Sequence, residues 1–250
     1  MSQPDQGQPR ADFFEGRRVA FFGGSFDPPH LGHVAVARAA LVGLELDKVL
    51  FAPVGAQPLK RRGSTASFED RLAMTRLAIA GEPRFDISLA DAPNALGEPN
   101  YSLETLERLR AELGTQCRLY FLMGADSFLG LNNWHRASEI PFAASLIVAS
   151  RPGEHLEGVK SSLPQGLTIE ATPERDRIAG NVDVRAYEIR NGSGERAEFY
   201  LLPGLDCEIS ATRIRGSMRK RAGAGKDDAE GERLVPEAVA EYVRAHGLYR

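Results

Sequence analysis

Two histidines and a pair of adjacent glycines stand close together within residues 23–33. Gly23 and Gly24 follow an apolar run, and His30 and His33 lie three residues apart at the start of an Ala/Val-rich segment. Residues three apart share one face of a helix, so the two imidazoles can donate hydrogen bonds to the same group. Glycines let the backbone approach a phosphate, and a helix N-terminus presents unpaired N–H groups to an anion. The spacing therefore predicts a phosphate site where a strand meets a helix.

Each part of this string also has a purely structural explanation. Gly-Gly after a strand is often only a turn, and a histidine pair on a helix is often a surface feature. The string contains neither the Gly-Lys-Ser/Thr of a P-loop nor a Gly-x-Gly-x-x-Gly fingerprint. We favour phosphate binding because the whole string stands between a predicted strand and a predicted helix.

A second group of candidate anion ligands lies near the C-terminus. Ser210 stands where a basic helix is predicted to begin, and Arg215 follows within it. We expect both to hold phosphates, because a helix N-terminus and a guanidinium both favour anions. The neighbouring basic residues are interpreted as a solvated helix face: Arg213, Arg219, Lys220 and Arg221.

Asp126 and Trp134 are isolated candidates in the middle of the chain. Asp126 follows an apolar strand, in the crevice where open α/β sheets bind ligands, and a helix cap is the alternative. Trp134 is the only tryptophan. Its ring suits stacking on an aromatic ligand, but a lone Trp is also typical of a core.

These candidates require a scaffold of alternating strands and helices. Strands are predicted at residues 17–22, 48–54, 85–89, 118–123 and 145–150. Helices are predicted at residues 31–43, 67–80, 103–113 and 236–246, and a basic helix is predicted after Thr212. In the second of these, Ser67 is expected to cap the helix and Asp70 to complete a capping box. This alternation predicts a Rossmann-like open parallel sheet with helices on both faces and a small C-terminal helical part.

The length allows one large domain or two small ones. We expect a disordered leader at 1–16 and a single α/β domain at 17–250, because the two predicted phosphate segments must share one crevice. Residues 151–200 interrupt the α/β rhythm and are expected to be an inserted surface segment. Within them, 182–190 and 196–202 flank turn residues and predict a hairpin. Residues 221–232 are expected to be a solvated loop.

The composition excludes several classes of protein. The net charge is −3, which argues against a nucleic-acid binder. Two widely spaced cysteines give no disulfide framework or thiolate zinc site, and they fit a cytoplasmic protein. No apolar run approaches the ~18 residues that cross a bilayer, so no membrane partner is expected. The sequence does not decide whether the chain forms a homo-oligomer.

Several segments together resemble one enzyme family. Residues 23–33 are similar to the signature of nucleotidyltransferases with the His-x-Gly-His motif, and 209–215 resemble their Ile-Ser-Ser-Thr-x-Ile-Arg. Residues 53–60, 100–106, 124–128 and 134–136 favour one branch, the bacterial nicotinate-nucleotide adenylyltransferases. One departure is Leu59, where the family usually has His.

The resemblance implies an adenylyltransferase that joins ATP and nicotinate mononucleotide, giving nicotinate adenine dinucleotide and pyrophosphate in NAD biosynthesis. The mononucleotide phosphate, already anionic, attacks the α-phosphorus in line. The implied catalytic residues are His30, His33 and Arg215. The implied ATP ligands are Gly23, Gly24, Ser25, Phe26, Gly124, Asp126, Ile209 and Ser210. The implied mononucleotide ligands are Lys60, Tyr101, Ser102, Thr105, Trp134 and His135, although residues 101–105 are equally the start of an ordinary helix.

No carboxylate cluster in the sequence predicts a protein-built metal site, so we expect Mg²⁺ to arrive with ATP. Two alternatives remain open. One is another adenylyltransferase of the superfamily, with phosphopantetheine or a different acceptor. The other is a non-catalytic nucleotide-binding module, which would tolerate the loss of His30, His33 or Arg215.

Overall fold

Parallel strands form the centre of the computed structural model, which describes residues 16–55, 63–95, 97–150, 160–205, 209–221 and 230–250. Within these residues, one sheet has the strand order β3-β2-β1-β4-β5-β9-β8-β6, with β7 paired to β8. The strands from β3 to β9 in that order are parallel. Their bounds are β1 (Arg18–Gly24), β2 (Lys48–Pro53), β3 (Phe85–Ile87), β4 (Arg118–Gly124), β5 (Ser145–Ala149) and β9 (Arg196–Leu202).

Both faces of the sheet are covered by helices, which is why the central strands are apolar on both sides. In β1, Val19 and Phe21 point to one face, and Ala20 and Phe22 to the other. The first face packs against α3 (Ser102–Leu113), α4 (Ala125–Leu129) and α5 (Ile140–Ala143). The second packs against α1 (Leu31–Gly43) and the end of α2 (Phe68–Ile79). The predicted fold class is confirmed.

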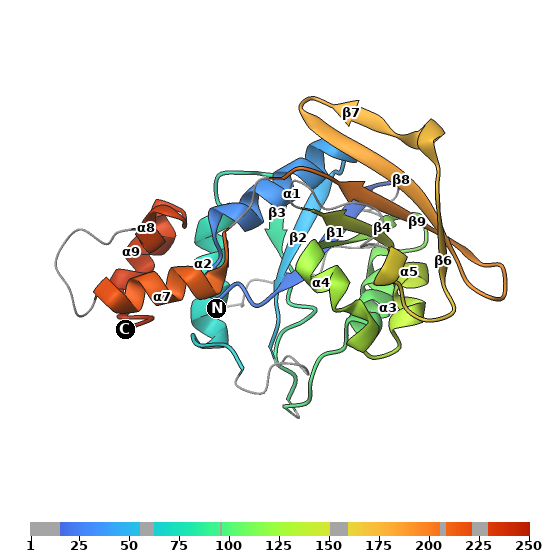
Figure 1. Ribbon diagram of the computed structural model, residues 1–250. Coiled ribbons are helices and arrows are strands. Elements are labelled where there is room, and N and C mark those ends of the chain that lie inside the picture. The colour runs from blue at the N-terminus through green and yellow to red at the C-terminus, as the bar shows by residue number, and fades with distance from the viewer. Residues whose placement is uncertain (1–15, 56–62, 96, 151–159, 206–208, 222–229) are drawn as a thin grey trace, which may run out of the picture.

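A C-terminal helical part lies at one end of the sheet, beside α2 (Figure 1). It contains α7 (Ala211–Arg221), α8 (Glu230–Arg233) and α9 (Glu237–Ala245). Met74 of α2 shares a core cluster there with Ile214, Val239 and Tyr249. The turn after α9, which contains Tyr249, therefore packs against α2.

The described part of 151–200 extends the sheet. It forms β6 (Thr168–Ala171), β7 (Arg177–Ala179), β8 (Val182–Arg190) and most of β9. The hairpin prediction is confirmed, because β8 and β9 pair in antiparallel fashion. Val184 and Phe199 are fully buried, and β9 also pairs with β5. The sequence did not indicate this contribution to the core, and the domain boundaries stay a prediction.

Some predicted boundaries differ from the structure. The strand expected at 85–89 ends at Ile87, because the Ala90 N–H donates to the Ser88 hydroxyl and Leu89 turns outward, 56% exposed. Thr212 lies inside α7, and Ser210 precedes the helix. The capping box at α2 is incomplete: Ser67 accepts from the Asp70 N–H, but the Asp70 carboxylate accepts from the Ser67 hydroxyl.

Several expectations lie outside the described residues: almost all of the leader 1–16, most of the 221–232 loop, and the positions Leu59 and Lys60. In the part of the chain that the structure describes, no helix is long and apolar enough to cross a membrane.

Candidate active site

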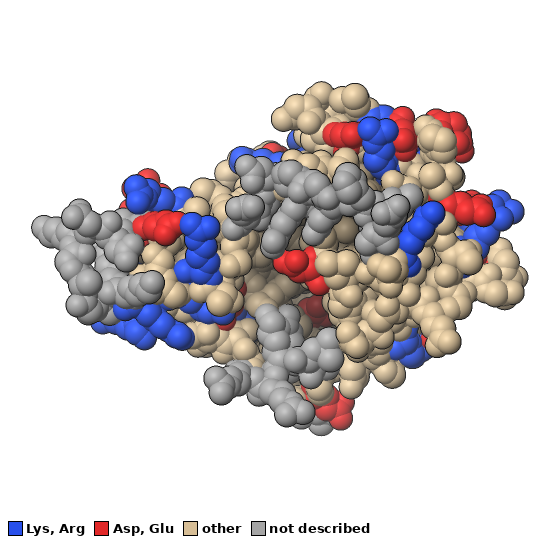
Figure 2. All heavy atoms as spheres, in the orientation of Figure 1, with Lys and Arg blue, Asp and Glu red and all other residues tan. Residues whose placement is uncertain are grey.

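A cavity of about 980 Å³ opens at the carboxyl ends of the parallel strands. Open α/β sheets bind ligands at this edge. Figure 2 shows a hollow in this face, with acidic side chains inside it and Lys and Arg side chains gathered over the C-terminal helices. The predicted site residues that line the cavity are Gly23, Gly24, Ser25, Phe26, His30, His33, Tyr101, Ser102, Gly124, Asp126, Trp134, His135, Ile209, Ser210 and Arg215.

The cavity has two sides, which the sheet edge separates. We call one the α1–α7 side; its residues are Ser25, Phe26, Asp27, His30, His33, Ser210 and Arg215. We call the other the α3 side; its residues are Asp91, Tyr101, Ser102, Trp134 and His135. Segments far apart in the sequence therefore meet in one space.

The two histidines of the α1–α7 side are stacked, with ring centroids 3.6 Å apart. The His30 N–H donates to His33 Nδ1 at 3.1 Å, so the neutral His33 ring carries its proton on Nε2. A Cβ at Gly32 would lie 3.0 Å from His30 Nδ1, which explains the glycine between them. His33 can thus donate one hydrogen bond from Nε2.

Burial keeps both histidines neutral. It lowers the pKa of His30 to about 4. Burial and the neighbouring His30 lower the pKa of His33 well below its ordinary value. Near neutral pH the two rings are therefore uncharged and offer hydrogen-bond donors to the cavity.

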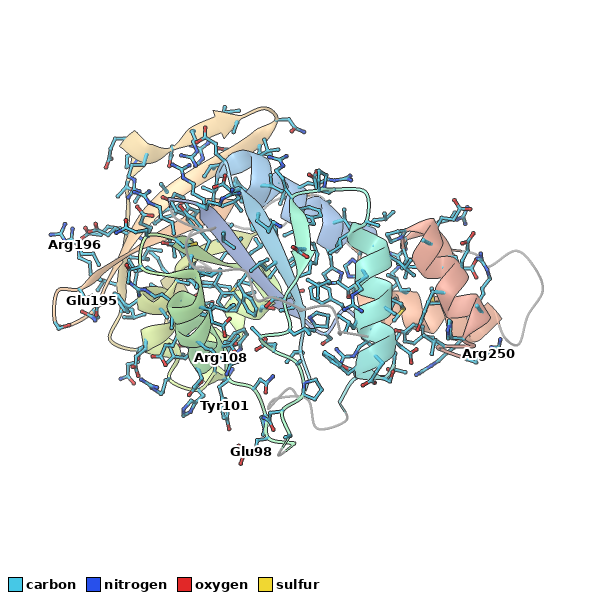
Figure 3. The ribbon with its side chains drawn as sticks, turned by 180° about the vertical axis from the view of Figure 1, so that it is seen from behind. Glu98, Tyr101, Arg108, Glu195, Arg196 and Arg250 are labelled. Atoms are coloured by element: carbon cyan, nitrogen blue, oxygen red, sulfur yellow. The ribbon has the colours of Figure 1, made fainter. Side chains whose placement is uncertain are left out.

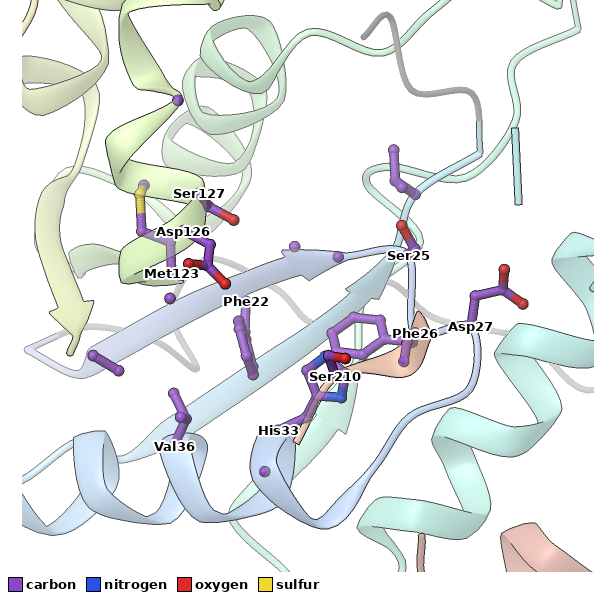
Figure 4. Close-up of a pocket in the computed structure, with 18 of the residues that line it drawn as sticks. Phe22, Ser25, Phe26, Asp27, His33, Val36, Met123, Asp126, Ser127 and Ser210 are labelled. Carbon is purple, nitrogen blue, oxygen red and sulfur yellow. The ribbon is translucent and has the colours of Figure 1, made fainter. Parts of the chain in front are cut away.

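Phe26 supports His33 from the side. Its ring centroid lies 4.9 Å from that of His33, in an edge-on arrangement. Phe26 has a left-handed backbone, with φ of 46°, which is rare for a bulky residue. Figure 4 shows His33 beside Phe26 and Ser210, with Asp126 and Ser127 facing the same space from α4. The strained turn therefore places an aromatic ring against the donor.

Arg215 joins α7 to the loop after β1. Its Nη1 donates to the Asp27 carbonyl oxygen at 2.6 Å and lies 3.8 Å from the Asp27 carboxylate. Its Nη2 donates to the Thr212 hydroxyl at 3.3 Å. Ser210 accepts from the Arg213 N–H at 3.2 Å, as an N-cap does. The guanidinium and the start of α7 thus face the cavity together.

Asp27 is the centre of a network that sequence reasoning missed. Its carboxylate accepts hydrogen bonds from the Thr65 N–H (2.6 Å), the Ala66 N–H (3.0 Å) and the Tyr249 hydroxyl (2.8 Å). Burial and this carboxylate raise the pKa of Tyr249, so its hydroxyl stays protonated and donates. The only signal in the sequence was the position of Asp27 inside the 23–33 string.

Arg71 of α2 also binds the loop after β1. The residue is 2% exposed, and its Nη1 donates to the Ser25 carbonyl oxygen at 2.7 Å. Desolvation lowers the pKa of its guanidinium, and the nearby Asp27 opposes that shift. Arg71 of α2, Arg215 of α7 and Tyr249 of the turn after α9 thus fix the loop from three separate segments.

The α3 side is more open. Tyr101, the N-cap residue of α3, is 39% exposed, and its ring lies 4.6 Å from the ring of His135. His135 Nε2 lies 3.5 Å from a Glu104 carboxylate oxygen. Trp134 is partly buried, with its ring 6.1 Å from that of Phe121 at the cavity floor. Aromatic rings from two segments therefore face this side.

Thr105 does not line the cavity, contrary to its prediction as a ligand. It is 1% exposed, and its hydroxyl donates to Asp91 Oδ1 at 2.6 Å. Asp91 takes the place in the cavity that was expected for Thr105. Asp91 follows a weak, short strand, and its sequence gave no motif that would mark it.

Asp126 lies in the first turn of α4, after the N-cap Gly124, and also lines the cavity. The helix dipole favours a carboxylate in the first turn, but Asp126 is not the N-cap residue, and its role as a ligand stays a prediction. Within the described residues, no three His, Cys, Asp or Glu side chains group as metal ligands would.

Known proteins of one family are similar to this chain. A family model described as cytidylyltransferase-like matches residues 21–217. A probable nicotinate-nucleotide adenylyltransferase of Dechloromonas aromatica is 36% identical over 232 residues, covering 93% of this chain and 97% of that protein. One from Gloeobacter violaceus is 36% identical over 234 residues, covering 94% and 97%. Among solved structures, the Plasmodium falciparum nicotinic acid mononucleotide adenylyltransferase complexed with NaAD has a TM-score of 0.66 at 15% identity, covering 93% and 97%.

The fold and the family model that matches residues 21–217 define an α/β protein of the cytidylyltransferase-like class. The identity to its relatives extends over nearly the whole chain and nearly the whole of theirs. The chain belongs to the nicotinate-nucleotide adenylyltransferase family.

Proposed function

We infer that this protein is an adenylyltransferase that joins ATP and nicotinate mononucleotide in NAD biosynthesis. A phosphate oxygen of the mononucleotide attacks the α-phosphorus of ATP, and the bond from that phosphorus to the β-phosphate bridging oxygen breaks. Nicotinate adenine dinucleotide forms, and pyrophosphate leaves with the electron pair. The observation that carries this conclusion is one cavity with neutral donors and a guanidinium on one side and aromatic rings on the other.

The reaction needs no nucleophilic side chain, because the attacking phosphate is already an anion. It needs alignment and stabilisation of the negative charge that spreads over the phosphates. We assign this to His33 Nε2–H, His30 and Arg215, which face the cavity from α1 and α7. Neutral histidines suit the task, because they donate hydrogen bonds and take no proton in the step.

We assign the ATP to the α1–α7 side. The backbone at Gly23 and Gly24 and the loop residues Ser25 and Phe26 lie where the phosphates would pass. Ile209 and Ser210, at the start of α7, support binding of the β- and γ-phosphates. The list of ATP ligands is completed by Gly124 and Asp126 at the start of α4.

We assign the mononucleotide to the α3 side. Trp134 offers a ring for stacking on the pyridine, and Tyr101, Ser102 and His135 surround the same space. Lys60 is proposed to bind the acceptor phosphate. It lies outside the described residues, but the flanking Val54 and Gly63 both line the cavity, which supports the assignment.

We propose Mg²⁺ as the metal that accompanies ATP. Mg²⁺ keeps several waters and takes one or two carboxylates together with substrate phosphates, and Asp126 offers such a carboxylate on the cavity wall. When bound, the ion would neutralise part of the charge that develops on the leaving pyrophosphate. Residues 17–250 are proposed to act as one domain, since Arg215 and Asp27 bond across 188 positions. A cytoplasmic location stays a prediction from the cysteine content.

Pyrophosphate release tests the proposal. The protein is incubated with ATP, Mg²⁺ and one acceptor: nicotinate mononucleotide, nicotinamide mononucleotide, phosphopantetheine or none. We expect release with nicotinate mononucleotide and none with phosphopantetheine. Saturable ATP binding without release for any acceptor would instead identify a non-catalytic binding module.

A further inference from the structure

Asp91 is a buried carboxylate at the cavity wall that none of the assignments above uses. It lies in the loop between β3 and α3 and is 6% exposed, yet it lines the cavity. Gly23, at the end of β1, is its neighbour across the sheet edge. A Cβ on Gly23 would lie 3.5 Å from Asp91 Oδ2. The carboxylate thus stands between the end of β1 and the start of α3.

The two oxygens of Asp91 have different surroundings. Oδ1 accepts from the Thr105 hydroxyl at 2.6 Å. For Oδ2, no hydrogen-bond donor is found among the residues that the structure describes. Oδ2 is not among the fully buried side-chain atoms that lack a partner, and Asp91 lines the cavity, so this oxygen is open to the cavity. This oxygen can therefore accept a hydrogen bond from a molecule that is bound in the cavity.

The loop holds Asp91 in place. The Gly55 N–H donates to the Asp91 carbonyl oxygen at 2.7 Å. A Cβ at Gly55 would lie 2.5 Å from the backbone nitrogen of Pro93, so only glycine allows this contact. Arg108 Nη2 donates to the Ala90 carbonyl oxygen at 2.6 Å. Figure 3 shows Arg108 and Tyr101 on the same side of the molecule.

The chemical groups of a mononucleotide indicate which of them can donate a hydrogen bond to Asp91 Oδ2. Its phosphate and its pyridine carboxylate are anions, which Asp91 would repel. Its neutral donors are the ribose hydroxyls, and carboxylates bind ribose hydroxyls in other α/β nucleotide sites. Burial raises the pKa of Asp91, and the Thr105 hydroxyl opposes that shift, in keeping with a carboxylate that accepts from neutral donors.

The position of Asp91 indicates which nucleotide it meets. The neighbouring Ala90 packs with α3 and Trp134 in the core cluster on the first face of the sheet. Phe26, which supports His33, belongs to the cluster on the other face. Asp91 therefore shares the α3 side, to which the acceptor is assigned.

We propose that Asp91 Oδ2 accepts a hydrogen bond from a ribose hydroxyl of the acceptor mononucleotide, with Thr105 as the positioning residue that orients the carboxylate. This inference rests on the proposed function. It makes the site selective for ribonucleotide acceptors over their deoxy analogues, because an analogue that lacks the hydroxyl loses a hydrogen bond to a charged acceptor.

The test compares nicotinate mononucleotide with its 2′-deoxy and 3′-deoxy analogues, in the wild type and in Asp91→Asn. In the wild type, kcat/KM should fall about 10–100-fold for at least one analogue. In Asp91→Asn that preference should shrink to within about 3-fold, because the Thr105 hydroxyl engages the amide oxygen and a neutral N–H group replaces the charged acceptor. Thr105→Val should weaken the preference, and Thr105→Ser, which keeps the hydroxyl, should restore it.

Asp86→Asn is the matched control, since Asp86 is an exposed carboxylate in β3 that pairs with Lys48. It should keep the full preference. A wild type that uses the intact and both deoxy acceptors equally would overturn the proposal. The proposal would also be overturned if Asp91→Asn lost the preference for ATP over 2′-deoxy-ATP but kept the preference for the intact acceptor over its deoxy analogues. A wild type that transfers nothing to the intact acceptor would instead contradict the proposed function. If Asp91→Asn does not fold, the Thr105 pair decides the outcome.

Discussion

The two sides of the cavity differ in how firmly they are held. On the α1–α7 side, the Asp27 carboxylate accepts three hydrogen bonds, and Arg71 and Arg215 bind backbone carbonyls of the same loop. On the α3 side, Tyr101 is 39% exposed and the His135 side chain is 47% exposed. Their support comes from a ring contact and from a 3.5 Å contact between His135 Nε2 and a Glu104 carboxylate oxygen. Donors that stabilise a transition state must stand in place before the reaction, whereas rings that recognise a substrate can adjust.

Among variants that test the difference between the two sides, His33→Ala is expected to have the largest effect. Loss of one preorganised donor should lower kcat about 10²–10³-fold, with a much smaller change in the KM of the acceptor. Single-turnover dinucleotide formation measures the step directly. His246→Ala removes an exposed histidine outside the cavity and should leave the rate unchanged. Near-native kcat in a well-folded His33→Ala protein would remove His33 from the chemistry.

Tyr249→Phe tests the firmness of the α1–α7 side from a distance. The change removes the hydrogen bond to Asp27, which should cost about 1.5–3 kcal/mol of unfolding free energy and raise the KM of ATP. Tyr242→Phe is the control, because its hydroxyl bonds to the Asp70 carboxylate at the surface and should matter less. Urea unfolding of both variants gives the comparison. Equal losses would mean that the Asp27 network holds the loop no better than a surface contact.

Acid should weaken the α1–α7 side first. The pKa of His30 is lowered to about 4 in the folded protein, while an unfolded histidine titrates near 6.5. Between these values the unfolded state binds more protons, so stability falls as the pH falls from about 6.5 to about 4. The loss is at most about 1.4 kcal/mol per pH unit for each such histidine. His30→Asn should flatten this decline in unfolding experiments, and an unchanged slope would contradict the burial argument.

Trp134→Leu probes the softer α3 side and should give the smallest effect. Leucine keeps most of the packing against Phe121 and removes the ring that is proposed to stack on the pyridine. The KM of the acceptor should rise about 3–10-fold, in line with ~0.5–1.5 kcal/mol for an aromatic pair, while the KM of ATP stays constant. Initial rates at varied concentrations of each substrate measure this. A rise in both KM values would indicate a purely structural tryptophan.

Local patterns predicted most of the fold. The apolar runs of β1, β4 and β5 are buried on both faces, and such runs are visible in any short window of the sequence. The parallel pairing of β9 with β5 was not predicted, because it depends on a contact between distant strands. Leu89 shows a smaller limit: its apolar character extended the predicted strand, but a local turn ended it.

The candidate site divides in the same way. His30, His33 and Arg215 were found because they stand in compact motifs that carry the family resemblance. Asp27, Asp91 and Tyr249 were not singled out, because each acts through partners elsewhere in the chain. The bond between Tyr249 and Asp27 spans 222 positions, and the one between Thr105 and Asp91 needs the loop after β3 to fold back on α3. Thr105 was assigned to the cavity for its motif and lies behind Asp91 instead.

The most direct test of adenylyl transfer follows the label of ATP into the product. The protein is incubated with nicotinate mononucleotide, Mg²⁺ and ATP labelled with ³²P at either the α- or the γ-phosphate. The α label should appear in nicotinate adenine dinucleotide, and the γ label should appear only in pyrophosphate. Transfer of the γ label to the acceptor, or α label that never leaves the unreacted ATP, would contradict the account.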